Sequence, residues 1–186
     1  MQTNYVGLDL GQRRDFTAIA VVERDDWMGT GLALRHLERM PLGTPYTKVV
    51  ERVCGIMRHP KMAARSRLVV DATGVGAPVV ELLRSSGIGA RITAVTITGG
   101  DRAHGRSEDW YVPRKDLLTG LEVLLENGEL RISRRLGEAA RLVGELTSIR
   151  AGRGESREHD DLVMAVALAC WSARLRMNGF GSGRLV

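Results

Sequence analysis

The chain has 186 residues, 44% of them hydrophobic and 26% charged, and a formal net charge of +5. These values are those of a globular domain with a substantial core, and they exclude a disordered or fibrous chain. The longest apolar run, 162–171, has about half the length of a membrane-spanning helix, so we expect a cytoplasmic protein with no membrane partner. The positive charge is compatible with an anionic partner.

Hydrophobic periodicity in the first half of the chain predicts three strands, followed by alternating helices and strands. Strand patterns occupy residues 4–11, 16–23, 32–40, 67–71 and 91–98. Helical patterns occupy residues 44–57 and 77–86. The short connections between the first three strands imply an antiparallel meander, and the later order implies a mixed sheet with helices on its faces.

The second half of the chain is predicted to be mainly helical. Glycine and charged residues dominate 99–112, which we expect to form a mobile loop. Further helices are expected at 113–127, 136–149 and 160–176, with a short strand at 130–132 and a basic loop at 150–157. We expect one domain over residues 1–177, followed by a flexible, glycine-rich tail at 178–186.

Four aspartates lie within or next to apolar segments, where a charged side chain is unusual. Asp9 lies in the middle of an apolar strand pattern, and Asp71 ends another. Asp160 and Asp161 open the last helix, where aspartates commonly cap free N–H groups and complement the helix dipole. Each residue taken alone has a purely structural explanation, either as a strand-end aspartate that supports a turn or as a helix cap.

The four carboxylates together indicate a metal site. If the first and fourth strands are adjacent, Asp71 lies beside Asp9, and the last helix can bring its acidic start to the same edge of the sheet. Carboxylates gathered in one place repel one another unless hard cations neutralise them, and oxygen ligands suit Mg²⁺ or Mn²⁺. No Cys or His spacing indicates zinc, and no Ser-His-Asp set is evident.

Three segments carry a resemblance to a known family. They are Gly7-Leu-Asp-Leu-Gly11 with Asp15-Phe-Thr-Ala18, Val69-Val-Asp-Ala-Thr-Gly-Val-Gly76, and His159-Asp-Asp-Leu-Val-Met-Ala165. In this order and spacing the segments resemble the nuclease domain of phage large terminase subunits, which belongs to the ribonuclease H-like superfamily. The resemblance covers nearly the whole chain, and the His-Asp-Asp segment is its most specific part.

The resemblance implies an α/β fold of the ribonuclease H-like type, with a five-stranded mixed sheet in the order 3-2-1-4-5 flanked by helices. It also implies that Asp9, Asp71 and Asp161 are catalytic metal ligands for two Mg²⁺ or Mn²⁺ ions, with Asp160 as a further ligand. Related nucleases often carry another acid one turn into the last helix, where this chain has Met164.

The implied function is that of a metal-dependent endonuclease that cleaves double-stranded DNA during viral genome packaging. Its partners would be double-stranded DNA, a terminase ATPase domain, the portal and the small subunit, in the host cytoplasm. The 186 residues contain no Gly-x-x-x-x-Gly-Lys-Ser/Thr loop. We therefore expect an excised nuclease domain or a free-standing relative rather than the packaging motor.

Two other functions are compatible with these residues. A Holliday-junction resolvase or a similar structure-specific nuclease would use the same fold and the same acids. An actin-like or sugar-kinase-like nucleotide-binding domain also opens with a Gly-x-Asp-x-Gly strand that holds a metal-bound phosphate. Proteins of that second kind need two such domains, however, and this chain has the length of one.

Arginines beside the last helix are candidates for contacts with DNA phosphates. The basic loop carries Arg150, Arg153 and Arg157 just before the His-Asp-Asp segment. Arginine suits phosphate recognition because its planar guanidinium group can donate two parallel hydrogen bonds. A solvated basic loop would explain the same residues, and the sequence leaves both interpretations open.

Overall fold

The computed structural model describes residues 2–11, 15–25, 31–63, 65–150 and 160–175. Within these residues, eight strands form one sheet in the order β6-β7-β5-β4-β1-β2-β3-β8. The strands are β1 (Gln2–Asp9), β2 (Ala18–Asp25), β3 (Leu32–Arg39), β4 (Ser66–Asp71), β5 (Arg91–Thr98), β6 (His104–Arg106), β7 (Asp109–Pro113) and β8 (Leu130–Ile132). The helices are α1 (Tyr46–Met57), α2 (Pro60–Ala63), α3 (Gly76–Ser85), α4 (Arg114–Glu126), α5 (Ala139–Arg150) and α6 (Asp161–Leu175).

The five central strands have the predicted order, because β3, β2, β1, β4 and β5 lie side by side. β2 is antiparallel to both β1 and β3, while β4 is parallel to both β1 and β5. The antiparallel pairs follow from short connections, and each parallel pair requires a longer crossover that contains a helix. The predicted mixed α/β sheet is therefore confirmed.

The sheet is wider than expected at both edges. The expected loop at 99–112 contains β6 and β7 instead, which form a hairpin beside β5. The glycine-rich sequence of this hairpin gives no sign of the contacts that stabilise it. One of them joins residues far apart in the sequence: the ring of Trp110 lies 5.6 Å from the ring of Trp171, edge to face. At the other edge, the predicted strand at 130–132 is β8, which runs parallel to β3.

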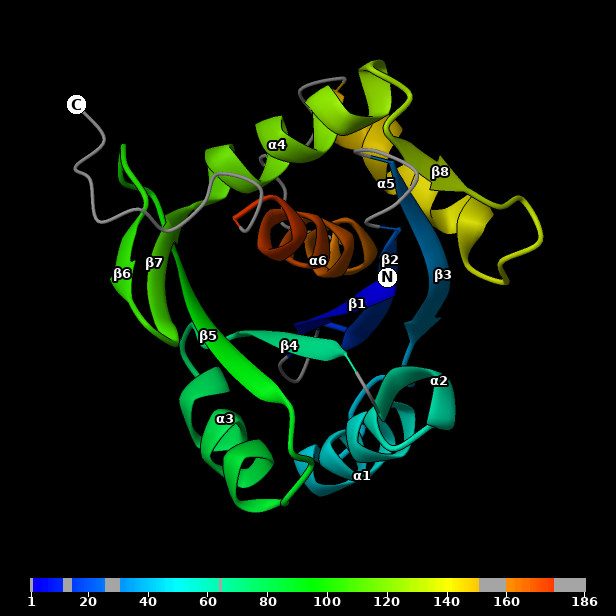
Figure 1. Ribbon diagram of the computed structural model, residues 1–186. Coiled ribbons are helices and arrows are strands. Elements are labelled where there is room, and N and C mark those ends of the chain that lie inside the picture. The colour runs from blue at the N-terminus through cyan, green and yellow to red at the C-terminus, as the bar shows by residue number, and fades with distance from the viewer. Residues whose placement is uncertain (1, 12–14, 26–30, 64, 151–159, 176–186) are drawn as a thin grey trace.

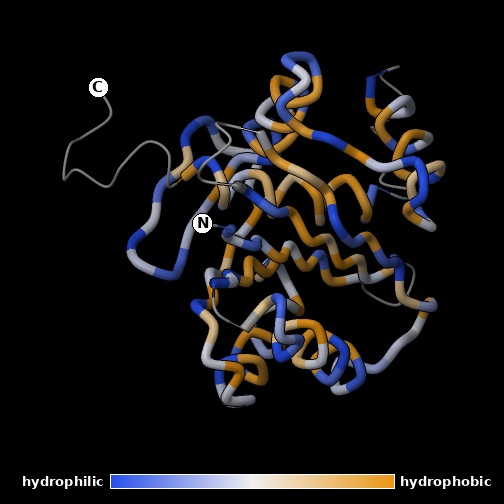
Figure 2. The backbone as a smooth tube through the Cα atoms, turned by 45° about the vertical axis from the view of Figure 1, so that its right-hand side comes forward, coloured by the Kyte–Doolittle hydropathy of each residue, from blue (hydrophilic) through white to orange (hydrophobic). Residues whose placement is uncertain are grey.

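Helices cover both faces of the sheet (Figure 1). One hydrophobic core lies between the sheet and α4, α5 and α6, and a second core lies on the opposite face under α1 and α3. Figure 2 shows hydrophobic residues along the inner strands and hydrophilic ones on the outer turns. Because α6 contacts β1 and β2 on one side and α4 on the other, nearly all of its residues are buried. This position explains its continuous apolar sequence.

None of the helices in the part of the chain that the structure describes is long and apolar enough to span a membrane. Two predicted segments, the basic loop after residue 150 and the tail at 178–186, lie outside the described residues.

The close contact between α6 and β1 depends on Gly7. A Cβ atom at Gly7 would lie 2.0 Å from the carbonyl oxygen of Ala165 and 2.9 Å from the backbone nitrogen of Ala169. The backbone of α6 thus occupies the space into which any other residue would extend its side chain. Asp9 lies two residues after Gly7 on the same face of β1, and Asp161 lies one helical turn before Ala165.

Replacing Gly7 with alanine tests this contact. The added methyl group would meet backbone rather than a flexible side chain, so α6 must shift, and we expect the free energy of unfolding to fall by about 1–3 kcal/mol or more. Thermal unfolding should show a loss in Tm of about 2–4 °C per kcal/mol. Gly55→Ala is the matched control, since a Cβ atom at Gly55 meets nothing within 4 Å and alanine favours a helix interior. Equal losses in the two variants would contradict the role assigned to Gly7.

Candidate metal centre

The carboxyl ends of β1 and β4 place Asp9 and Asp71 side by side. In the parallel pairing of these strands Leu8 lies opposite Val70, so the next residue on each strand is an aspartate at the same level of the sheet. The two carboxyl groups are close enough to form a hydrogen bond with each other. The adjacency expected for these two residues is therefore observed.

The start of α6 lies at the same edge of the sheet. Asp160 precedes the helix, and its carbonyl oxygen accepts a hydrogen bond from the N–H of Met164 at 2.8 Å, which makes Asp160 the N-cap residue. Asp161 is the first residue of α6, and only 5% of its surface is exposed. Both carboxylates are near enough to Asp9 to raise its pKa. The structure thus brings the four predicted aspartates together.

The negative charge of Asp9 and Asp71 is unfavourable in these surroundings. The pKa of Asp9 is raised well above its ordinary value, first by burial and then by the negative charges of Asp71, Asp161 and Asp160. Burial also raises the pKa of Asp71, although hydrogen bonds from Thr73 oppose this shift. One of them runs from the N–H of Thr73 to Oδ1 of Asp71, at 2.8 Å. In the absence of a cation, a proton shared between Asp9 and Asp71 relieves part of the repulsion.

Two arginines that were not predicted pair with the acids of α6. Arg39, the last residue of β3, has its Nη2 atom 3.2 Å from Oδ2 of Asp161, and its guanidinium carbon lies 3.7 Å from the centre of the Phe16 ring. Arg114, the first residue of α4, forms an ion pair with Asp160. Simple alternation does not indicate Arg39, because an irregularity in the pairing of β3 with β2 at Arg35 shifts the alternation and brings Leu37 and Arg39 to the face of Leu32 and Leu34. Nothing in the sequence around Arg114 indicates its partner.

Glu145 of α5 is a buried acid that was also missed. Its Oε2 atom accepts a hydrogen bond from the N–H of Val163 at 3.1 Å, in the first turn of α6, and Oε1 has no hydrogen-bond partner among the described residues. Burial is the largest cause that raises the pKa of Glu145 to about 7; the hydrogen bond from Val163 and the charge of Arg39 lower it, while Asp161 and Asp160 raise it. No motif marks this residue in the sequence, since its role depends on the packing of α5 against α6.

The chemistry of the cluster fits a hard divalent cation. It offers carboxylate oxygens from β1, β4 and α6, and its raised pKa values show negative charge that a cation would stabilise. Among the described residues, however, no three His, Cys, Asp or Glu side chains already have the arrangement of a formed metal site. Because Asp160 and Asp161 are engaged by arginines, binding of a metal would require these side chains to rearrange.

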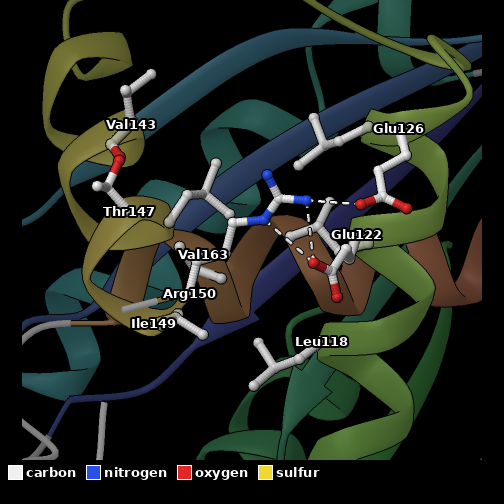
Figure 3. Close-up of a pocket in the computed structure, with 11 residues that line it drawn as sticks. Leu118, Glu122, Glu126, Val143, Thr147, Ile149, Arg150 and Val163 are labelled. Carbon is white, nitrogen blue, oxygen red and sulfur yellow. Dashed lines mark hydrogen bonds and ion pairs between the residues drawn. The ribbon is translucent and has the colours of Figure 1, made fainter. Parts of the chain in front are cut away.

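The arginines predicted to bind DNA are only partly described. Arg150, the last residue of α5, forms ion pairs with Glu126 at 2.7 Å and with Glu122 at 3.1 Å. It lies at a groove of about 690 Å³ between α4 and α5 (Figure 3). These partners on α4 neutralise Arg150 within the chain, and its contact with DNA stays a prediction. Arg153 and Arg157 lie outside the described residues.

The sheet order and the placement of the helices give an α/β domain with a ribonuclease H-like fold, and solved structures share this fold. No family model and no curated protein matches the sequence. The large terminase nuclease from thermophilic phage G20c is 23% identical, with a TM-score of 0.59 over 90% of this chain and 81% of that one. The human cytomegalovirus terminase nuclease domain is 19% identical, with a TM-score of 0.57 over 91% and 82%. The large terminase of bacteriophage HK97 is 16% identical, with a TM-score of 0.59 over 92% of this chain and 40% of that one.

The chain therefore has the fold of terminase nuclease domains, as its three sequence segments predict. At these identities the likeness is one of fold, and the roles of the four aspartates depend on the geometry described above.

Replacing Glu145 with glutamine tests the electrostatics of the site. A pKa raised from 4.5 to about 7 means that the folded protein keeps a proton that the unfolded chain releases, so stability falls as the pH rises from about 4.5 through 7. Glutamine keeps an oxygen for the N–H of Val163 but cannot ionise. In EDTA at pH 8, we expect thermal unfolding to show Glu145→Gln as more stable than the unmodified protein, by up to roughly 3 kcal/mol, with little difference at pH 5. The same gain at both pH values would contradict the raised pKa.

Proposed function

We propose that the chain is a metal-dependent endonuclease that cleaves double-stranded DNA. The observation that carries this proposal is the convergence of Asp9, Asp71 and Asp161, from three separate elements, at one edge of a sheet with the fold of terminase nuclease domains. Two similar structures support the choice of metal. The nuclease domain of the large terminase from bacteriophage SPP1 has bound Mn, and the human cytomegalovirus terminase nuclease domain was soaked with Mn.

Each acid has a distinct place in this proposal. Asp9, Asp71 and Asp161 would hold two Mg²⁺ or Mn²⁺ ions, with Asp9 as the shared ligand because the charges of the other three acids all act on it. Such ions, when bound, supply an activated water and neutralise charge at the scissile phosphate. Asp160 caps α6 and would add a weaker contact. The burial of Asp161 limits the water that competes for its oxygens.

Glu145 and Thr73 would act on the ligands rather than on the substrate. Glu145 accepts the N–H of Val163 and so holds the first turn of α6, which carries Asp161, against α5. Thr73 holds Oδ1 of Asp71 through its backbone N–H. Partners of this kind restrict the orientations of metal ligands, which are otherwise free to rotate.

Viral genome packaging is the setting that we propose for this activity. The large terminase of bacteriophage HK97 contains a region similar to nearly all of this chain, and that region is 40% of its length. In such a setting an ATPase domain, a portal and a small subunit would be partners, and Arg150, Arg153 and Arg157 would contribute to DNA binding.

The first test of the proposal is incubation of the protein with supercoiled plasmid in Mn²⁺, Mg²⁺ or EDTA. We expect nicked and linear products with either metal and none in EDTA, since the carboxylates alone provide no activated water. Products should have varied end sequences, because no base-reading element is evident among the described residues. Equal cleavage in EDTA would exclude a metal mechanism, and tight binding of ATP without cleavage would favour the nucleotide-binding alternative.

The second test separates the four acids. Asp9→Asn, Asp71→Asn and Asp161→Asn should abolish cleavage while circular dichroism shows an intact fold, because each variant removes a metal ligand. Asp160→Asn retains a good helix cap and should lower cleavage by only about 10–100-fold, the range for residues that support a metal site. Asp109→Asn is the matched control and should cleave normally, since this aspartate begins β7 and its side chain is 70% exposed. Cleavage that survives Asp161→Asn but not Asp160→Asn would reverse the assignment of these two residues.

A further inference from the structure

Arg39 lies at the same level of the sheet as the acid cluster. Ala18 of β2 is the pairing partner of Asp9 on one side and of Arg39 on the other. These three residues therefore form a row across three neighbouring strands, and the start of α6 lies over that row. The row brings the guanidinium group of Arg39 to Asp161, one of the proposed metal ligands.

The contacts of Arg39 place its guanidinium group over the Phe16 ring and beside Asp161. The group stacks on the Phe16 ring at 3.7 Å and pairs with Asp161 at 3.2 Å, and the two paired side chains are 12% and 7% exposed. A guanidinium group stacked on a ring can turn within its plane without losing the stack. The adjacent residue Glu38 points to the opposite face of β3, where it pairs with Arg52 of α1 at 2.7 Å.

Metal binding changes the balance of charge at Asp161. A divalent ion on the carboxylate competes with Arg39 for the same negative charge and repels the guanidinium group. A DNA phosphate that arrives with the ion offers two oxygens to the planar donors of arginine, as a carboxylate does, so it can replace Asp161 as the partner of Arg39. Metal and DNA together therefore favour an exchange of partners.

We infer that Arg39 pairs with Asp161 in the absence of metal and binds a DNA phosphate once a divalent ion occupies the Asp161 carboxylate. This inference rests on the proposed metal-dependent nuclease function. It makes metal and DNA each strengthen the binding of the other, because linkage between two sites is reciprocal. Without metal, Arg39 stays with Asp161 and adds nothing to DNA affinity.

The test compares the salt dependence of DNA binding with and without a metal. Affinity for a short duplex is measured over a range of salt concentrations in Ca²⁺, with gels that verify intact DNA, and again in EDTA. We expect Arg39→Gln to reduce the slope of log affinity against log salt by roughly 0.9 in Ca²⁺, the loss of one phosphate contact, and to leave the slope in EDTA unchanged. Arg52→Gln is the matched control, and any change that it causes should be the same in both conditions.

Two results of the salt titration would contradict the exchange of partners at Arg39. An unchanged slope in Ca²⁺ would overturn the inference, and so would an equal loss in Ca²⁺ and EDTA, which would mean a permanent phosphate contact. Calorimetric titration of the unmodified protein with Mn²⁺ and Ca²⁺, without DNA, separates this failure from that of the proposed function. Absence of metal binding would overturn both, whereas metal binding with an unchanged slope would overturn the exchange alone.

Two further measurements guard against a variant that fails to fold. In the unmodified protein, the Nε–H resonance of Arg39 should shift when Mg²⁺ and DNA are added together, and a resonance that stays in place would contradict the exchange. Titration of Arg39→Gln with Mn²⁺ in the absence of DNA should show a Kd lower by about 5-fold or more, since the competing cation has been removed. Equal Kd values in the variant and the unmodified protein would count against competition.

Discussion

The approach of α6 to β1 at Gly7 is the constraint on which the rest of the structure depends. The carbonyl oxygen of Ala165 occupies the space that a side chain at position 7 of β1 would need, so this glycine fixes the point at which the backbones of helix and strand meet. From there, four residues back along a helix and two residues forward along a strand both cover about 6–7 Å. The step leads to Asp161 on α6 and to Asp9 on β1. A contact between two backbones thus determines which carboxylates meet.

The same packing keeps the repelling acids in place. α6 is buried between the sheet and α4, and its apolar residues contribute a large share of the core on that face. That burial stabilises the fold, whereas the acids gathered around the start of α6 work against it, since Asp9, Asp71 and Glu145 all have raised pKa values. Protons, two arginines and, in our proposal, divalent cations are three ways in which this charge is compensated. The site is therefore a region of lower stability supported by a helix that is almost entirely buried.

The sequence predicts those features that depend on local pattern. Alternating apolar residues located the five central strands, and the strand order implied by the family resemblance placed Asp71 beside Asp9. The pattern put Asp9 in the middle of its strand, whereas β1 ends at this residue. The β6–β7 hairpin was missed because it is stabilised by its pairing with β5 and by the contact of Trp110 with Trp171, which lies far away along the chain. The partners Arg39, Arg114 and Glu145 were missed for the same reason. Each comes from a different element, and nothing in the local sequence shows that all three face the start of α6.

Helix α4 forms ion pairs with the two residues that flank 151–159, Arg150 and Asp160. Glu122 and Glu126 of α4 pair with Arg150, the residue before this segment, and Arg114 at the other end of α4 pairs with Asp160, the residue after it. One helix thus positions both ends of the segment that carries Arg153 and Arg157. It also separates the arginines by role, since Arg150 is neutralised by α4 itself, whereas Arg114 neutralises an acid of the proposed metal site.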